Sequence, residues 1–318
     1  MNQILKKKIL NFLKIIISII LISYIISQLN LDSLSAKFTN IWFILFFIFL
    51  LFINIFNNVI ISALKLKNIL QSFSKEKIKF WEVAKIYLYS TFFGLFLPTN
   101  FGGDGAKCIF LERKYKNIGR SSVILSVFLE RISGILALLG IMAVSLIVPS
   151  VRHYYWLIFD LIANRLSINQ SKTIIIILLF CVLFSVIIYL TVRYRSKVIG
   201  LIESFKKINY FTVFLLSFIF QFLMILNNII AYYYFSGQTN YTAFVIIIPI
   251  TILLMTLPIS FQGIGLRDGL ALLLFPLFFV NPKQEDIISY TLSMNLLIVF
   301  SSLLGGVLYL IKKIKPTS

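Results

Sequence analysis

Two short breaks in otherwise apolar sequence decide the fold: Leu97-Pro-Thr-Asn-Phe-Gly-Gly-Asp-Gly105 and, 160 residues later, Leu257-Pro-Ile-Ser-Phe-Gln-Gly-Ile-Gly265. They share the leucine, the proline, the phenylalanine and two glycines at matching positions, and a basic residue follows each, Lys107 and Arg267. Proline and glycine are unfavourable inside a helix. Each break therefore predicts a helix that stops and a second helix that starts again.

The composition around these breaks is typical of an integral membrane protein. Hydrophobic residues make up 59% of the 318 residues and charged residues 13%, against about 45–50% and 25% in soluble domains. This chain has more apolar surface than one core can bury. Its apolar runs reach the roughly 20 residues that a helix needs to cross the hydrocarbon core, and they do not alternate as barrel strands do.

The basic loops predict which apolar runs cross the membrane. Loops rich in Lys and Arg usually lie on the cytoplasmic side of a membrane. Most of the 30 Lys and Arg residues of this chain fall on one side only if segments 81–117 and 241–280 enter the membrane and return to the same side. The second return limb, 269–280, is roughly 18 Å of helix and too short to cross. The predicted spans are residues 9–29, 40–63, 121–149, 173–191, 209–235 and 287–311.

We therefore predict an all-α integral membrane protein with six transmembrane helices and two re-entrant helical hairpins. We place it in the plasma membrane with both termini cytoplasmic. Residues 1–150 give two spans, a hairpin and one span, and residues 151–318 repeat that order from the opposite side. Such an inverted-topology repeat with helices broken at mid-membrane is typical of alternating-access transporters. Chance similarity between apolar segments is the alternative.

The breaks also predict an anion-binding cavity. Exposed backbone inside a membrane must line a cavity or contact protein, and helices that restart near Ala106 and Leu266 would point N–H groups into it. Lys107 and Arg267 would then oppose the helix dipoles in the first turns, which suggests an anionic ligand unless each cation pairs with its acidic neighbour. The other candidate binding residues are those neighbours and the small residues of the breaks: Asp104, Asp268, Gly102, Gly103, Gly105, Ser260, Gly263 and Gly265.

An ionisable pair lies near the middle of span 121–149. Glu130 and Arg131 are roughly 15 Å along the helix from its start, and charge at that depth is costly and marks function by default. Adjacent helical residues do not face each other, so we expect Arg131 to meet substrate and Glu130 to meet Lys107 or Arg267. A structural link between the two repeats is the alternative.

Other chemistries find little support in the sequence. Cys108 and Cys181 are isolated and His153 is the only histidine, which leaves no metal-site pattern. Residues 103–107 lack the spacing of a phosphate-binding loop. The net charge of +19 follows from the basic loops rather than from a nucleic-acid surface. We predict no cofactor and no nucleic-acid partner.

Three motifs resemble the transmembrane region of lysylphosphatidylglycerol synthases (the multiple peptide resistance factor family) and its flippase-like relatives. They are Leu97-Pro98…Gly102-Gly103-Asp104, Glu130-Arg131-x-x-Gly134 and Pro258-Ile-Ser…Gly263-x-Gly265-x-Arg267-Asp268. The resemblance covers most of the chain and implies movement of a lipid between leaflets, in the best-known case an aminoacylated phosphatidylglycerol. Glu130 and Lys107 stand where the family pattern has Asp and Arg, and both keep the charge.

We therefore expect a lipid translocase that moves an anionic or aminoacylated phospholipid, or a polyprenyl-phosphate-linked lipid, between leaflets. The full synthases also carry a soluble aminoacyl-tRNA-dependent transferase domain, which we expect to be missing because the sequence ends directly after the last span. Two alternatives stay open: a membrane-embedded transferase with Glu130, Asp104 or Asp268 as base, and a small-anion transporter. A homo-oligomer and a separate lipid-modifying enzyme also stay open as partners.

Overall fold

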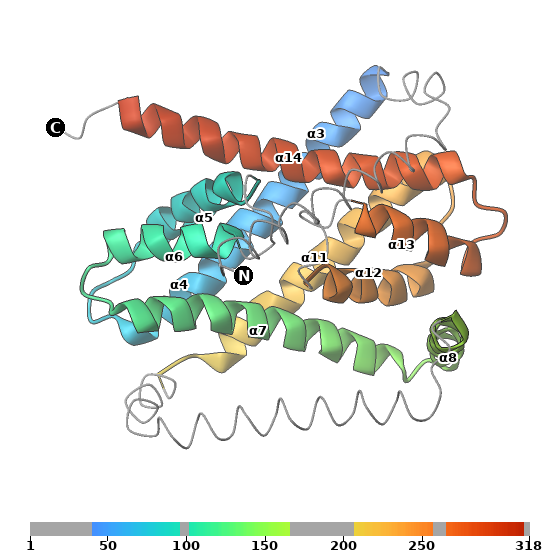
Figure 1. Cartoon of the computed structure of the whole chain (residues 1–318), viewed down its shortest axis with the longest axis horizontal. Coiled ribbons are helices and arrows are strands. Elements are labelled where there is room, and N and C mark those ends of the chain that lie inside the picture. The colour runs from blue at the N-terminus through green and yellow to red at the C-terminus, as the bar shows by residue number, and fades with distance from the viewer. Residues whose placement is uncertain (1–39, 96–101, 166–206, 257–264, 315–318) are drawn as a thin grey trace, which may run out of the picture.

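The computed structural model describes residues 40–95, 102–165, 207–256 and 265–314, and within these ranges the chain is helical with no strand (Figure 1). This confirms the all-α class. The predicted spans 9–29 and 173–191, and the candidate residues Ser260 and Gly263, lie outside the described ranges.

Four described helices are long and apolar enough to cross a membrane: Ile41–Phe73, Arg120–Ser145, Tyr210–Ser236 and Gln284–Ile311. Many of their large apolar side chains point away from the protein, as in Trp42 and Phe211, which are 69% and 77% exposed. An exposed apolar surface of this extent is stable in lipid and unfavourable in water. The chain is a multi-pass membrane protein.

The first of these helices is longer than the sequence predicted. It consists of α3 (Ile41–Ile55), a π-helical turn η1 (Phe56–Ile61) and α4 (Ser62–Phe73). The prediction ended this span at residue 63 and placed the following lysines in a loop. That placement is wrong for Lys65, which is buried within α4.

Two pairs of shorter helices lie between the long ones. α5 (Phe80–Leu95) packs on α6 (Gly102–Lys114), and α12 (Tyr241–Thr256) packs on α13 (Leu266–Leu274), which a short 3₁₀ turn, η2 (Phe275–Leu277), extends. Figure 1 shows the first pair toward one end of the molecule and the second pair toward the other. α6 begins at Gly102 rather than near Ala106, so Lys107 lies in the second helical turn and not in the first.

The remaining long helices pack across the two halves of the chain. α7 (Arg120–Ser145) contacts α12, and α14 (Gln284–Ile314) contacts α5, so the last long helix of each half lies against the helix pair of the other half. α11 (Tyr210–Ser236) packs on α4, α7 and α14 between them. A further helix, α8 (Pro149–Arg165), follows α7 and contacts α12.

The contact between α5 and α14 is very close because α14 carries two successive glycines. A Cβ atom on Gly305 would lie 1.9 Å from the backbone oxygen of Leu88, and one on Gly306 would lie 2.4 Å from the ring of Phe92. Small residues commonly permit such close approach between membrane helices. The two glycines therefore hold the second half of the chain against the first.

Candidate functional site

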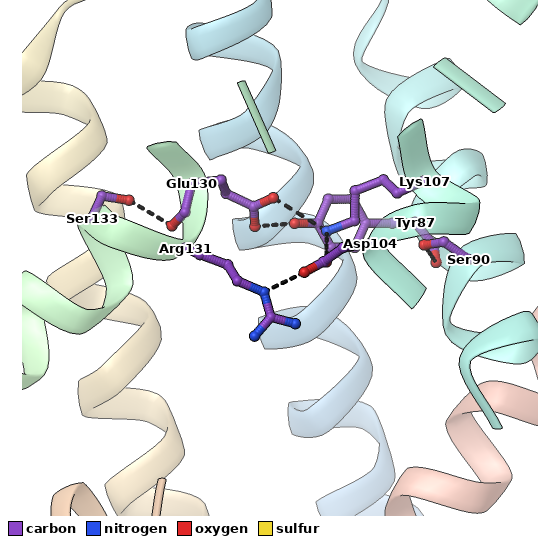
Figure 2. Close-up of polar contacts among 7 residues, drawn as sticks. All are labelled: Tyr87, Ser90, Asp104, Lys107, Glu130, Arg131 and Ser133. Atoms are coloured by element: carbon purple, nitrogen blue, oxygen red, sulfur yellow. Dashed lines mark hydrogen bonds and ion pairs between the residues drawn. The ribbon is translucent and has the colours of Figure 1, made fainter. Parts of the chain in front are cut away.

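Lys107 is the centre of a buried ionic network. Its side chain projects from α6, and the residue is only 6% exposed. Its ammonium nitrogen lies 3.2 Å from Oε2 of Glu130, 3.3 Å from Oδ1 of Asp104 and 3.9 Å from the ring centroid of Tyr87. Two carboxylates and an aromatic face therefore compensate one cation (Figure 2).

Arg131 and Tyr87 extend this network on either side of Lys107. The Nε of Arg131 donates to Asp104, and the hydroxyl of Tyr87 donates to Glu130. Figure 2 shows the two side chains leaving α7 in different directions, Glu130 toward Lys107 and Tyr87, and Arg131 toward Asp104. Each carboxylate is thus held by two groups from two different helices: Asp104 by Lys107 and Arg131, and Glu130 by Lys107 and Tyr87.

The network lines one wall of a cavity of about 380 Å³, here called the central cavity. This volume falls within the roughly 300–1,000 Å³ usual for small-ligand sites. Helices from both halves of the chain contribute side chains. The charged residues at its wall are Lys65, Asp104, Lys107, Glu130 and Arg131, and the polar ones are Asn54, Asn58, Ser62, Tyr87, Ser90, Thr91, Gln221, Thr256, Ser301 and Ser302.

Lys65 and Tyr87 belong to this site and were missed from the sequence. Lys65 is 4% exposed, and its ammonium nitrogen lies 5.5 Å from the ring centroid of Phe220. The sequence did contain a signal for Lys65. It follows the polar residue Asn58 by seven positions, about two helical turns, so a continuous helix would place both side chains on one face. Tyr87 gave no comparable signal, since its partner Glu130 lies 43 residues away.

Arg267 lies in a different environment in the second half. It is the second residue of α13, and its guanidinium lies 3.4 Å from Oδ1 of Asn295 and 3.9 Å from the sulfur of Met255. The neighbouring Asp268 faces the backbone: it accepts from the N–H of Gly265 at 2.8 Å and from Nδ2 of Asn295 at 3.2 Å. Among the described residues, Arg267 forms no ion pair with Asp268.

Arg267 lines a second cavity of about 120 Å³ next to the central one. Tyr290 also lines it, and its hydroxyl donates to Oδ1 of Asn228 at 2.5 Å. The two cavities share four lining residues: Asn54, Asn58, Ile252 and Ile298. A polar region thus runs from the Lys107 network to Arg267.

A family model described as "Lysylphosphatidylglycerol synthase TM region" matches residues 11–306 of the chain. The chain belongs to this family. The resemblance drawn from the three motifs is therefore confirmed, and the matched segment contains every residue that lines the two cavities. No curated protein and no solved structure matched the chain.

The predicted glycines differ in what they do. Gly103 lines the central cavity, and a Cβ there would lie 3.3 Å from the backbone oxygen of Ser90, so it permits the close packing of α6 on α5. Gly102 begins α6, Gly105 is exposed on that helix, and Gly265 has a φ of 83° at the start of α13. A positive φ of this size favours glycine, which has no Cβ, at position 265.

Two buried amide side chains form hydrogen bonds between helices. Nδ2 of Asn57 donates to the backbone oxygen of Phe220 at 2.9 Å, and Nε2 of Gln221 donates to that of Gly134 at 3.1 Å. The carbonyl oxygens of both side chains are buried and have no hydrogen-bond partner among the described residues. In the same part of the chain, no three His, Cys, Asp or Glu residues are grouped as metal ligands.

Proposed function

We propose that the protein is a lipid translocase that moves an anionic lipid between leaflets. Membership of the family indicates a membrane function related to lipids. The observation that carries the finer proposal is the central cavity, which holds five charged side chains among membrane-spanning helices. Charge at that depth is expensive, and a polar cavity can replace the water that an anionic headgroup loses on leaving the surface.

The proposed architecture is six transmembrane helices and two re-entrant hairpins, arranged as an inverted repeat of residues 1–150 and 151–318. Three features support it: the short helix pairs, their positions toward opposite ends of α7 and α14, and the packing of each last helix on the other half's pair. The basic loops support cytoplasmic termini, and we place the protein in the plasma membrane.

In this proposal the headgroup occupies the cavity while the acyl or polyprenyl chains stay in the bilayer. Lys107, Arg131 and Arg267 supply positive charge. Asp104 and Glu130 orient the first two, and Asp268 holds Asn295, which contacts Arg267. The N-termini of α6 and α13 add backbone N–H groups to the binding site. The small residues proposed to leave that backbone open are Gly102, Gly103, Gly105, Ser260, Gly263 and Gly265.

The two alternative functions, a transferase and a small-anion transporter, differ from the proposal in the role of the carboxylates and in the kind of anion that is moved. A transferase would need a carboxylate free to take a proton, whereas Glu130 and Asp268 both accept hydrogen bonds from neighbouring groups. A small-anion transporter would move inorganic anions and leave labelled lipid in its leaflet. Nucleic acid plays no part in the proposal, while a homo-oligomer and a separate lipid-modifying enzyme are compatible with it.

The test is leaflet exchange of a labelled anionic phospholipid, fluorescent phosphatidylglycerol, in proteoliposomes of the full chain. We expect exchange with the wild type, and its loss in Arg267→Ala and in Lys107→Ala/Arg267→Ala. The control is Lys75→Ala/Lys77→Ala, which removes two exposed positive charges between α4 and α5. Equal exchange in all variants would contradict the binding site, and no exchange with folded wild type would contradict translocation.

A further inference from the structure

The central cavity carries one more positive than negative charge among its described residues. Three cations line it, Lys65, Lys107 and Arg131, against two carboxylates, Asp104 and Glu130. Lys107 lies between both carboxylates, and Arg131 bonds to Asp104. The excess positive charge therefore belongs to Lys65.

Within the described part of the chain, the ammonium of Lys65 has no hydrogen-bond or ion-pair partner. The ammonium lies over the face of the Phe220 ring, 5.5 Å from the ring centroid. An ammonium has three donors, and burying them without acceptors is unfavourable. A residue that is 4% exposed and lines a polar cavity in this way is poised to receive an anion.

Space for that anion lies beside Gly134 on α7. Gly134 lines the central cavity, and a Cβ on it would be in ordinary van der Waals contact with the ammonium of Lys65 (3.8 Å) and the amide nitrogen of Gln221 (3.7 Å), so both donors lie close to this part of the cavity wall. Both side chains line the same cavity, from α4 and α11. Lys65 thus faces a position where an oxyanion can accept hydrogen bonds.

We propose that Lys65 is the principal anion-binding residue of the central cavity, and that its ammonium binds the phosphate oxygens of a phosphodiester headgroup. Lys107 then has a positioning role, because its own charge is already compensated. The inference rests on the proposed function in naming a lipid as the source of the phosphate. The Lys65 site itself can be tested by binding alone.

Binding is measured on purified full chain in detergent with two probes, dihexanoyl phosphatidylglycerol and inorganic phosphate. Lys65→Gln should weaken the affinity for the lipid at least tenfold, as expected for loss of a hydrogen bond to a charged group. Lys65→Arg should stay within a few-fold of the wild type. Lys67→Gln is the matched control, since it removes the same charge two residues later on α4 and does not line the central cavity.

Stability without anion separates binding from a structural role. Lys65→Gln removes an uncompensated buried charge, so the protein without anion should unfold at the same temperature as Lys67→Gln or higher. Gly134→Ala should leave folding intact and weaken lipid binding several-fold, because its methyl group fills space beside the ammonium.

The outcomes are distinct. Unchanged affinity in Lys65→Gln, no binding of either probe by the wild type, or destabilisation by Lys65→Gln without loss of affinity would each overturn the proposal. Lys65-dependent binding of phosphate without any lipid exchange would support the Lys65 site and contradict the translocase. Lipid exchange that persists in Lys65→Gln with wild-type affinity would support the translocase and contradict the Lys65 site.

Discussion

Lys107 and Arg267 occupy matching places in two similar sequence motifs, yet their surroundings differ. Lys107 contacts two carboxylates and an aromatic ring. Arg267 contacts a side-chain amide and a thioether, and its acidic neighbour Asp268 bonds elsewhere. Similar sequence motifs therefore do not give these two cations the same electrostatic role, which depends on the helices that pack against each of them.

The helix pairs of the two halves are joined to their long helices by different kinds of contact. In the first half, ionic contacts tie α6 to α7. In the second half, hydrogen bonds from the amide of Asn295 to the carboxylate of Asp268 tie α13 to α14, and the guanidinium of Arg267 lies at a cavity wall. Substitutions at equivalent positions should therefore have unequal effects.

The largest effect is expected when the compensated cation is removed. Lys107→Met leaves Glu130 and Asp104 each without one buried cation, which should lower the free energy of unfolding by about 3 kcal/mol. Arg267→Met leaves no carboxylate unpaired among the described residues and should cost less than about 1 kcal/mol. Unfolding in mixed micelles of detergent and SDS measures both, and equal losses would contradict the comparison.

A steric effect nearly as large is expected at the helix contacts. Gly305→Ala places a Cβ against the backbone of Leu88 and should cost about 3 kcal/mol, because neither backbone can move freely. The matched change on the other half's long helix is Gly140→Ala, whose Cβ would meet only the ring of Phe218 at 3.5 Å. We expect the latter to change stability by less than about 1 kcal/mol. Similar losses in both would argue against the close α5–α14 contact.

A functional effect should accompany the small stability change at Arg267. Arg267→Met is expected to slow lipid exchange in proteoliposomes about tenfold, since a charged contact to phosphate is worth roughly one such factor. Arg267→Lys keeps the charge and should restore most of the rate. A wild-type rate in Arg267→Met would show that the second cavity does not handle the headgroup.

Losses of stability smaller than those of Lys107→Met and Gly305→Ala are expected at two buried tyrosines that each donate one side-chain hydrogen bond. Tyr87→Phe removes a hydrogen bond to the carboxylate of Glu130 and should cost about 2 kcal/mol. Tyr290→Phe removes one to the neutral amide of Asn228 and should cost about 1 kcal/mol. Unfolding of the two variants under the same conditions tests this order, and a larger cost for Tyr290→Phe would reverse it.

Apolar length and helix breakers were enough to predict the four long helices and the two interrupted segments. The start of α6 was predicted four residues too late because glycines were expected to stay outside a helix. Gly103 is helical because packing on α5 outweighs its low propensity. Helix boundaries therefore depended on tertiary contacts that local sequence does not display.

The site was predicted in its acidic and basic members but not in its connections. Glu130 and Arg131 were identified as costly charges at depth, and Lys107 and Asp104 as a cation and its acidic neighbour at the first break. The four side chains lie together. Lys65 was assigned to a loop because a lysine after an apolar run usually marks the membrane surface. In fact α4 continues past Lys65, because Leu66, Ile69 and Leu70 are buried in the protein. This burial depends on how the helices pack together, which the local sequence does not reveal.

The paired glycines of α14 have a mechanical consequence. Because Gly305 and Gly306 bring α14 onto the backbone of α5, sliding or separating these two helices would break the tightest seam between the halves. Under the proposed function, a movement that admits a lipid headgroup to the central cavity would therefore carry α5 and α14 together. This seam joins residues from both sides of position 150, because α5 lies before it in the chain and α14 after it.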